Sequence, residues 1–273
     1  MKRALAAYRL AESVLGRSGA WRIGRLLYRG ARRELVNDPA LNGEYALQDW
    51  VLRASPDGAI IAIDVGANVG EWTLEMSRKL GTRSASLVAF EPVPALHAPL
   101  TEALHGVAEV RPEAVTDRVG EMKFHITGEN TGTNALEVRG PADAISVPTT
   151  TIDAVAPGRI HLLKIDTEGN DLNVLLGAAD TIREHRVDVI QFEVNWRWTL
   201  FRSTLLEVFD LAHAHDYAVG QLTSKCIEIH ADWHPELERT METNFVLLAP
   251  GMEQRLRTRR VSFNASNVVV SAA

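Results

Sequence analysis

The sequence has few of the features that cross-link a chain or hold it in a membrane. Its 273 residues include one cysteine, Cys226, which cannot form a disulfide within the chain. No apolar run reaches the roughly 18 residues that a membrane-spanning helix needs. The N-terminal apolar residues are interrupted by Arg9 and Glu12, so they do not form a secretory signal. We therefore expect a cytoplasmic protein with no membrane span.

An excess of positive charge is also missing. The chain carries 29 Lys and Arg against 35 Asp and Glu, a net charge of −6, with a pI near 5.9. Such a chain lacks the basic field of a non-specific nucleic-acid binder, so we expect no nucleic-acid partner. With 46% hydrophobic and 23% charged residues, the composition is that of a globular protein, which excludes collagenous and disordered chains.

The first 57 residues have apolar positions at helical spacing with arginines between them. We expect an N-terminal helical extension over residues 1–57, packed on the main domain with its arginines in solvent. The alternative is a basic patch that contacts an anionic substrate, a carrier protein or a membrane surface. Gly58 marks the start of the main domain, residues 58–273.

From residue 59, short apolar runs alternate with helical stretches. The expected strands cover 59–65, 85–90, 160–165 and 187–194, and the expected helices cover 71–80, 94–104, 171–182 and 203–213. Near-continuous apolar runs are typical of strands buried on both faces. This alternation predicts an α/β fold with a doubly wound, mostly parallel sheet. A half-exposed strand at 122–126 and a long loop at 127–143 interrupt the pattern.

A glycine-containing loop follows the first expected strand, with Asp64, Gly66, Asn68 and Gly70 in order. The loop lies where doubly wound sheets bind ligands. The dinucleotide fingerprint G-x-G-x-x-G is absent because Asn68 stands at its second glycine, and no Gly-Lys-Ser/Thr follows. Asp64 would repel a pyrophosphate and attract a cation. The structural alternative is a tight strand-to-helix turn.

The second expected strand ends in an acid, Glu91, followed by Pro92. A carboxylate at this position accepts the two hydrogen bonds of a ribose diol in related folds. A loop without phosphate-binding features, joined to a ribose acid, indicates an adenosine cofactor with a sulfonium group. That cofactor is S-adenosyl-L-methionine.

A third motif follows the strand at 160–165, with Lys164, Asp166, Glu168 and Gly169 in order. Together with the first two motifs it resembles the FkbM family of S-adenosylmethionine-dependent methyltransferases, over about residues 60–194. The pieces of the resemblance, in chain order, are Asp64-x-Gly66-x-Asn68-x-Gly70, Trp72-Thr73, Phe90-Glu91-Pro92, Ala114-Val115-x-Asp117, Thr151-Ile152-Asp153, Lys164-Ile165-Asp166-x-Glu168-Gly169 and Phe192-Glu193. Three positions depart from the family: Trp72 replaces tyrosine, Thr167 replaces valine and Asp171 replaces glutamate.

The resemblance implies a Rossmann-like class I methyltransferase fold with seven strands, the last antiparallel. It further implies O-methylation of a small molecule such as a sugar or natural product. By the same resemblance, Gly66, Asn68 and Gly70 would line the methionine end of the cofactor, with Asp64 and Trp72 in the same motifs. Glu91 and Pro92 would lie at the ribose, and Val115 and Asp117 at the adenine.

An alcohol is a weak nucleophile, so a base should accept its proton as the methyl group is transferred. Asp166, beside the cofactor strand, is the leading candidate and Glu168 the second. The structural alternative is that Glu168 caps the next helix and Lys164 pairs with an acid such as Glu193. Clustered acids could also hold Mg²⁺, and Cys226, His230 and His234 have a spacing seen at zinc sites. We expect no metal.

The expected acceptor side follows the strand at 187–194. Glu193, Asn195, Trp196 and Trp198 would bind substrate there, although core packing is the alternative for each tryptophan. A loop containing Asn134 would close over the site. The other functions to separate are methylation of an amine or carboxylate on a peptide or carrier-bound substrate, and a non-catalytic partner subunit. A homodimer is compatible with the sequence.

Overall fold

The computed structural model describes residues 2–34, 37–55, 57–125, 135–136, 144–156, 158–239 and 242–272. The chain divides into two compact units, residues 1–37 and 38–273, and each is considered by itself. The first unit contains one helical element, α1 (Lys2–Ala31), which is kinked at Gly16, where φ is 67°. The described helices include none that is both long and apolar enough to cross a membrane.

The second unit begins earlier than the expected boundary at residue 58. Helix α2 (Pro39–Asn42) and helix α3 (Glu44–Ala54) belong to it, because Leu47 and Val51 of α3 are fully buried in the main core. Lys79 of helix α4 (Glu71–Leu80) donates to the carboxylate of Asp49 at 2.9 Å and so ties the two helices together. The boundary therefore lies at residue 37, because the α3 pattern that suggested an extension is a core-packing face.

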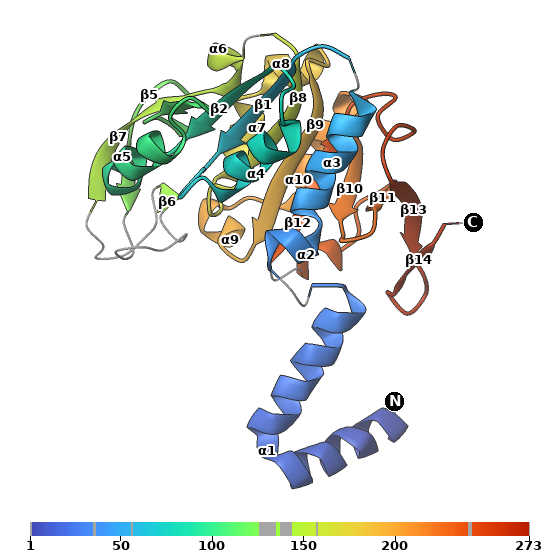
Figure 1. The fold of residues 1–273 in the computed structure, drawn as a ribbon. Coiled ribbons are helices and arrows are strands. Elements are labelled where there is room, and N and C mark those ends of the chain that lie inside the picture. Colours follow the sequence, from blue (N-terminus) through green and yellow to red (C-terminus); the bar gives the residue numbers. More distant parts are fainter. Residues whose placement is uncertain are drawn as a thin grey trace. The chain divides into compact units, whose positions relative to one another are not determined.

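The large sheet contains ten strands in the order β14-β13-β11-β10-β12-β9-β8-β1-β2-β3 (Figure 1). The bounds of its strands are β1 (Ile60–Val65), β2 (Ala85–Phe90), β3 (Glu109–Arg111), β8 (Ile160–Ile165), β9 (Val187–Asn195), β10 (Ala218–Leu222), β11 (Ile227–His230), β12 (Glu242–Leu248), β13 (Thr258–Phe263) and β14 (Val269–Ser271). Six of these strands run in the same direction: β3, β2, β1, β8, β9 and β10. Strand β12 lies between β9 and β10 and is antiparallel to both.

These seven strands confirm the predicted doubly wound sheet with its last strand reversed. The expected count of seven is three too low, because β11, β13 and β14 extend the edge beyond β10. From β1 the chain runs outward to β2 and β3, and from β8 it runs the other way to β9. The switch point therefore lies between β1 and β8, where ligands bind in folds of this type.

The remaining helices connect or flank the strands. They are α5 (Pro94–Ala103), α6 (Ile152–Val155), α7 (Asp171–Leu176), α8 (Ala179–Arg183), α9 (Trp198–Phe201), α10 (Leu205–Ala214) and the 3-10 turn η1 (Leu237–Arg239). The single helix expected over 171–182 is interrupted at Gly177. A Cβ there would lie 2.1 Å from the carbonyl oxygen of Thr116, so the chain passes too close to that backbone for a side chain.

A smaller four-stranded sheet, in the order β4-β7-β5-β6, lies beside the large one (Figure 1). Its strands are β4 (Ala114–Val115), β5 (Gly120–His125), β6 (Ala135–Leu136) and β7 (Ala144–Thr150). Strand β5 covers the half-exposed strand expected at 122–126 up to residue 125. Phe124 and Val147 form a small core of their own with Val93 and Ala114. This sheet supplies one wall of the cleft described next.

Candidate active site

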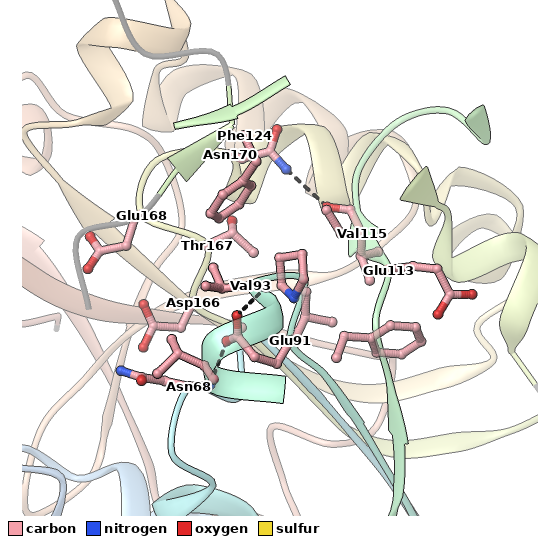
Figure 2. A pocket seen from close by; sticks show the side chains of 16 residues that line it. Asn68, Glu91, Val93, Glu113, Val115, Phe124, Asp166, Thr167, Glu168 and Asn170 are labelled. Atoms are coloured by element: carbon pink, nitrogen blue, oxygen red, sulfur yellow. Dashed lines mark hydrogen bonds between the residues drawn. The ribbon is translucent and has the colours of Figure 1, made fainter. Parts of the chain in front are cut away.

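A cleft of about 710 Å³, including its open mouth, lies at the carboxyl ends of β1, β2 and β8. It is therefore at the switch point. Its lining residues are Val65, Gly66, Asn68, Phe90, Glu91, Pro92, Val93, Leu96, Glu113, Ala114, Val115, Phe124, Asp166, Thr167, Glu168 and Asn170. In Figure 2, Asn68 and Glu91 lie in the lower part of the view and Asp166 and Glu168 at the left. Phe124 is near the top and Val115 is at the right.

The floor of the cleft is a turn after β1 that only glycine can form at its first position. Gly66 has φ 82°, and a Cβ on it would lie 1.9 Å from the carbonyl oxygen of Asp166. The amides of Gly66 and Ala67 both donate to the carbonyl oxygen of Phe90, at 3.0 and 2.9 Å. The ends of β1, β2 and β8 are thus locked together by backbone contacts. A ligand in the cleft would meet bare backbone here.

Glu91 is held by the backbone on both of its carboxylate oxygens. Its Oε2 accepts a hydrogen bond from the amide of Asn68 at 3.0 Å, and its Oε1 accepts one from the amide of Val93 at 2.8 Å (Figure 2). Burial raises the pKa of Glu91 to about 7, although these two hydrogen bonds oppose the shift. Each oxygen keeps a lone pair for a ligand hydroxyl. Asn68 has φ 51°, a conformation that asparagine tolerates better than most residues.

The wall opposite Glu91 is largely apolar. Val115 and Phe124 line it, and the Nδ2 group of Asn170 donates to the carbonyl oxygen of Val115 at 3.0 Å (Figure 2). Neither Asn170 nor Phe124 was predicted as a site residue. Nothing in the sequence brings β5 or the start of α7 to this wall, because both are placed by long-range packing. Asp117 is outside the cleft and lines a neighbouring hollow instead.

Lys164 is buried beneath the cleft between two acids. Its Nζ lies 3.3 Å from Oδ1 of Asp64 and 3.4 Å from Oδ2 of Asp166. Burial alone would lower the pKa of Lys164, but Asp64, then Asp166 and Glu44, outweigh it and raise that pKa. The sequence suggested an acid such as Glu193 as the partner. The sheet register explains the difference, because Lys164 lies directly beside Asp64.

Asp64 therefore has an internal function. Its Oδ2 accepts a hydrogen bond from the Thr73 hydroxyl at 2.7 Å, and its carboxylate does not line the cleft. Two other predicted cofactor residues also lie behind the lining. Gly70 permits close packing of Leu100, whose Cδ1 would lie 2.6 Å from a Cβ there. Trp72 is buried in the main core.

Asp166 and Glu168 both reach the cleft, from the loop that follows β8 (Figure 2). The Asp166 side chain is 38% exposed, so a ligand in the cleft can reach it while Lys164 fixes its direction. Glu168 is more enclosed, and its Oε2 accepts hydrogen bonds from Arg197 at 2.5 Å and Asn195 at 3.3 Å. Burial, then the charge of Asp166, raises the pKa of Glu168 to about 7, and Arg197 opposes this.

Glu168 is not a helix cap, because the residue before α7 is Asn170. The acid cluster instead continues to β9. The Nδ2 group of Asn195 donates to Glu193 at 2.8 Å as well as to Glu168. Burial, then the charge of Asp166, raises the pKa of Glu193. Asn195 thus bridges two carboxyl groups whose pKa values are both raised by burial.

The two tryptophans after β9 differ sharply. Trp196 is 60% exposed and has the Arg197 guanidinium 5.1 Å from the ring centroid. Trp198 is 3% exposed and donates from Nε1 to the carbonyl oxygen of Glu193 at 2.9 Å. Only Trp196 has a surface to offer a substrate, so core packing accounts for Trp198. The loop with Asn134 lies outside the described residues.

The charges around the cleft decide which cofactors fit. Of the described residues that line it, four are acids (Glu91, Glu113, Asp166 and Glu168) and none is Lys, Arg or His. An acidic, partly apolar cleft disfavours phosphates and favours a cation with a flat apolar ring. S-adenosylmethionine has a sulfonium, an ammonium group, a ribose diol and an adenine, so the residues present fit it. Among the described residues, no group of three or more His, Cys, Asp or Glu could hold a metal ion.

Comparison with known proteins gives a family. Residues 64–219, more than half of the chain, match the family described as the methyltransferase FkbM domain. The crystal structure of methyltransferase FkbM from Methylobacillus flagellatus KT shares the fold with a TM-score of 0.51 and 16% sequence identity. The match covers 90% of this chain and 59% of that one, so the chain spans about three fifths of that protein's length. Among curated proteins, no sequence matches this chain.

Two further solved structures are more distant. A precorrin-6y C5,15-methyltransferase from Geobacter metallireducens GS-15 has a TM-score of 0.37 and 12% identity, covering 75% of this chain and 88% of its own. A putative rRNA methylase from Clostridium thermocellum has a TM-score of 0.43 and 8% identity, covering 76% and 95%. The family and the fold confirm the predicted class I methyltransferase architecture and imply S-adenosylmethionine as the methyl donor.

Proposed function

Because the chain belongs to the FkbM methyltransferase family, we propose that it is an S-adenosylmethionine-dependent O-methyltransferase. Its acceptor is a hydroxyl group of a small molecule of the sugar or natural-product type. One observation carries the proposal. A cleft without basic residues has a backbone-held acid, Glu91, on one side and a reachable carboxylate, Asp166, on the other.

The residues that would hold the methyl donor follow from the cleft. Glu91 would accept the ribose hydroxyls, and the bare backbone from Gly66 to Asn68 would face the methionine part. Val115 and Phe124 would pack against the adenine, with Asn170 fixing that wall. When bound, S-adenosylmethionine supplies a methyl group on a sulfonium, and the carbon–sulfur bond breaks as the bond to the acceptor oxygen forms.

Asp166 is the proposed base. It would accept the proton of the acceptor hydroxyl while that oxygen is methylated, so the oxygen develops no positive charge. The buried ammonium of Lys164, anchored by Asp64, holds the Asp166 carboxylate toward the cleft. We propose Lys164 as a positioning residue, since it reaches the acceptor only through Asp166. Glu168 is the second candidate base, because a pKa of about 7 lets it accept a proton at neutral pH.

The acceptor would enter from the side of β9. The exposed ring of Trp196, with the Arg197 guanidinium 5.1 Å from its centroid, offers an apolar surface for a ring-shaped acceptor such as a sugar. Asn195 and Glu193 lie behind Glu168 on that side, where Asn195 donates to both carboxylates, so we propose that they position Glu168. The single free cysteine, Cys226, is compatible with the cytoplasmic location that we propose.

The test is a screen of hydroxyl, amine and carboxylate acceptors with a methyl-labelled donor, read by mass spectrometry. On an active hydroxyl acceptor, Asp166→Asn should lower kcat by about 10²- to 10⁴-fold. Glu168→Gln is the matched variant, because it removes a neighbouring carboxylate from the same loop. A protein that methylates amines alone, or an Asp166→Asn variant with unchanged kcat, would contradict the proposal.

Donor affinity must be measured in parallel by calorimetry. Both variants should bind S-adenosylmethionine within about threefold of the parent, since each replaced carboxylate is already paired with a cation, Lys164 or Arg197, and its charge then adds little to binding. A shared loss of affinity would mean that Asp166 serves the donor, and the assignment as base would then be wrong.

A further inference from the structure

The N-terminal unit has a charge opposite to that of the rest of the chain. Residues 1–34 contain nine Lys and Arg and two Glu, a net charge of +7, so the other residues carry −13 of the total of −6. The residues that line the candidate active site all belong to unit 2. The unusual composition of α1 therefore needs a separate explanation.

The charges of α1 are arranged by helical period. After the kink at Gly16, Arg22, Arg25 and Arg29 recur at spacings of three and four residues, which places them on one face. Ile23 and Leu27 are four residues apart and share another face. Before the kink, Leu10 and Val14 repeat that spacing. The segment after the kink thus has a row of arginines on one face and apolar side chains on another.

The apolar side chains of α1 are not buried within the first unit. Ten large apolar side chains of this element are between 41% and 72% exposed: Leu5, Tyr8, Leu10, Val14, Leu15, Trp21, Ile23, Leu26, Leu27 and Tyr28. Exposed apolar side chains at this density mark a contact surface for something outside the unit.

Aromatic and basic groups meet where the two sides join. The guanidinium of Arg25 lies 5.2 Å from the centroid of the Trp21 ring, and that of Arg32 lies 5.4 Å from the Tyr28 ring. Tryptophan and tyrosine with adjacent arginines are typical of the headgroup level of a bilayer, where one end of the side chain is apolar and the other is solvated.

We propose that residues 2–34 bind the surface of an anionic lipid bilayer, with α1 lying in the interface. Such an interface accepts both sides of the helix at once, because acyl chains cover the apolar side and anionic headgroups pair with the arginines. A second copy of the chain is a poorer occupant, since it would bring one +7 segment against another.

The test is flotation of the full chain with vesicles. We expect binding to phosphatidylcholine vesicles that contain about 30% phosphatidylglycerol, no binding to pure phosphatidylcholine, and release in high salt. The triple variant R22E/R25E/R29E should bind at least about 100-fold more weakly. A variant L26S/L27S, which keeps every charge, should also bind more weakly, because it loses apolar contact with the acyl chains.

The matched control is R78E/R183E/R239E, which changes the net charge equally but on exposed arginines of unit 2. It should bind vesicles within about threefold of the parent. Unchanged S-adenosylmethionine affinity in all variants would show that unit 2 remains folded. Absence of vesicle binding, equal binding to neutral vesicles, or an R22E/R25E/R29E-sensitive dimer in sedimentation velocity without vesicle binding would overturn the proposal.

Discussion

The two sides of the cleft are built in different ways. On the side of β1 and β2, Gly66, Asn68 and Glu91 are fixed by backbone hydrogen bonds, and no charged side chain takes part except the Glu91 carboxylate itself. On the side of β8 and β9, Glu168, Asn195 and Arg197 are held by one another. The first side is thus a rigid backbone surface, and the second is a network of interacting charged and polar side chains.

The difference indicates a division of work. A ligand common to a whole family can be bound by rigid backbone, because its shape does not vary. On the other side, burial and neighbouring charges set the pKa of Glu168, the second candidate proton acceptor. Substitutions on the backbone side should therefore weaken S-adenosylmethionine binding, whereas those on the network side should shift rates and pH profiles with the fold intact.

The largest expected effect is that of Gly66→Ala. Its Cβ would lie 1.9 Å from the carbonyl oxygen of Asp166, and no flexible side chain is there to move. We expect S-adenosylmethionine affinity to fall by more than about 100-fold and the melting temperature to drop by several degrees. Calorimetry and thermal unfolding measure both.

Gly58→Ala is the control, because Gly58 also has a positive φ, 77°, but has nothing within 4 Å of its Cβ position. It should cost only about 1 kcal/mol of stability from the left-handed backbone. If Gly66→Ala behaves like Gly58→Ala, close backbone packing does not shape the cleft.

A smaller loss is expected for Glu91→Gln. The amide has one acceptor oxygen and one NH₂ group, so it cannot accept hydrogen bonds from both Asn68 and Val93. We expect S-adenosylmethionine affinity to fall by about 10- to 100-fold, measured by calorimetry. Glu113→Gln is the control in the same cleft, since Glu113 pairs with the Arg111 side chain rather than with backbone. Equal losses in the two variants would contradict the account.

A substitution in the side-chain network of β8 and β9 should change the pH dependence of kcat. Arg197 opposes the rise in the pKa of Glu168, so Arg197→Gln should raise that pKa further above 7. If the ionised Glu168 supports turnover, the acid limb of kcat should move to higher pH by about one unit. Arg202→Gln, a control on the exposed residue after α9, should leave the limb in place. An acid limb that stays in place would show that the ionised form of Glu168 does not support turnover.

The smallest effect concerns stability. Burial, then the charge of Asp166, raises the pKa of Asp171 to about 7, so the folded protein binds a proton that the unfolded chain releases above about pH 4. This contribution is fully present at low pH and is lost as the pH rises through 7. Thermal unfolding between pH 5 and 8 should therefore show a shallower decline for Asp171→Asn than for the parent. Asp210→Asn, on the exposed side of α10, should keep the parent's slope.

The same contrast explains what the sequence could predict. Glu91 was predicted because it directly follows a recognisable strand, and Gly66 and Asn68 because the motif after the preceding strand resembles the FkbM family. Parallel strands end at the same edge, which brings the three together. Asp166 and Glu168 were predicted on the same ground. Both groups line the cleft.

What was missed depends on contacts between distant segments. Asn170 and Phe124 reach the cleft through the packing of the small sheet against α7, which no local pattern encodes. Conversely, Asp64 and Trp72 occur in the recognised motifs, yet they face Thr73 and the core because neighbouring residues of a strand or helix point in different directions. The edge strands β13 and β14 lack a buried apolar run, so the sequence pattern did not predict them as strands.

The most direct test of the account is a crystal structure with S-adenosylhomocysteine, the demethylated donor. We expect its ribose hydroxyls at hydrogen-bonding distance from Glu91, its adenine against Val115 and Phe124, and its sulfur facing Asp166. A nucleoside bound elsewhere, or a Glu91 carboxylate turned away from the amides of Asn68 and Val93, would contradict the assignment of this cleft.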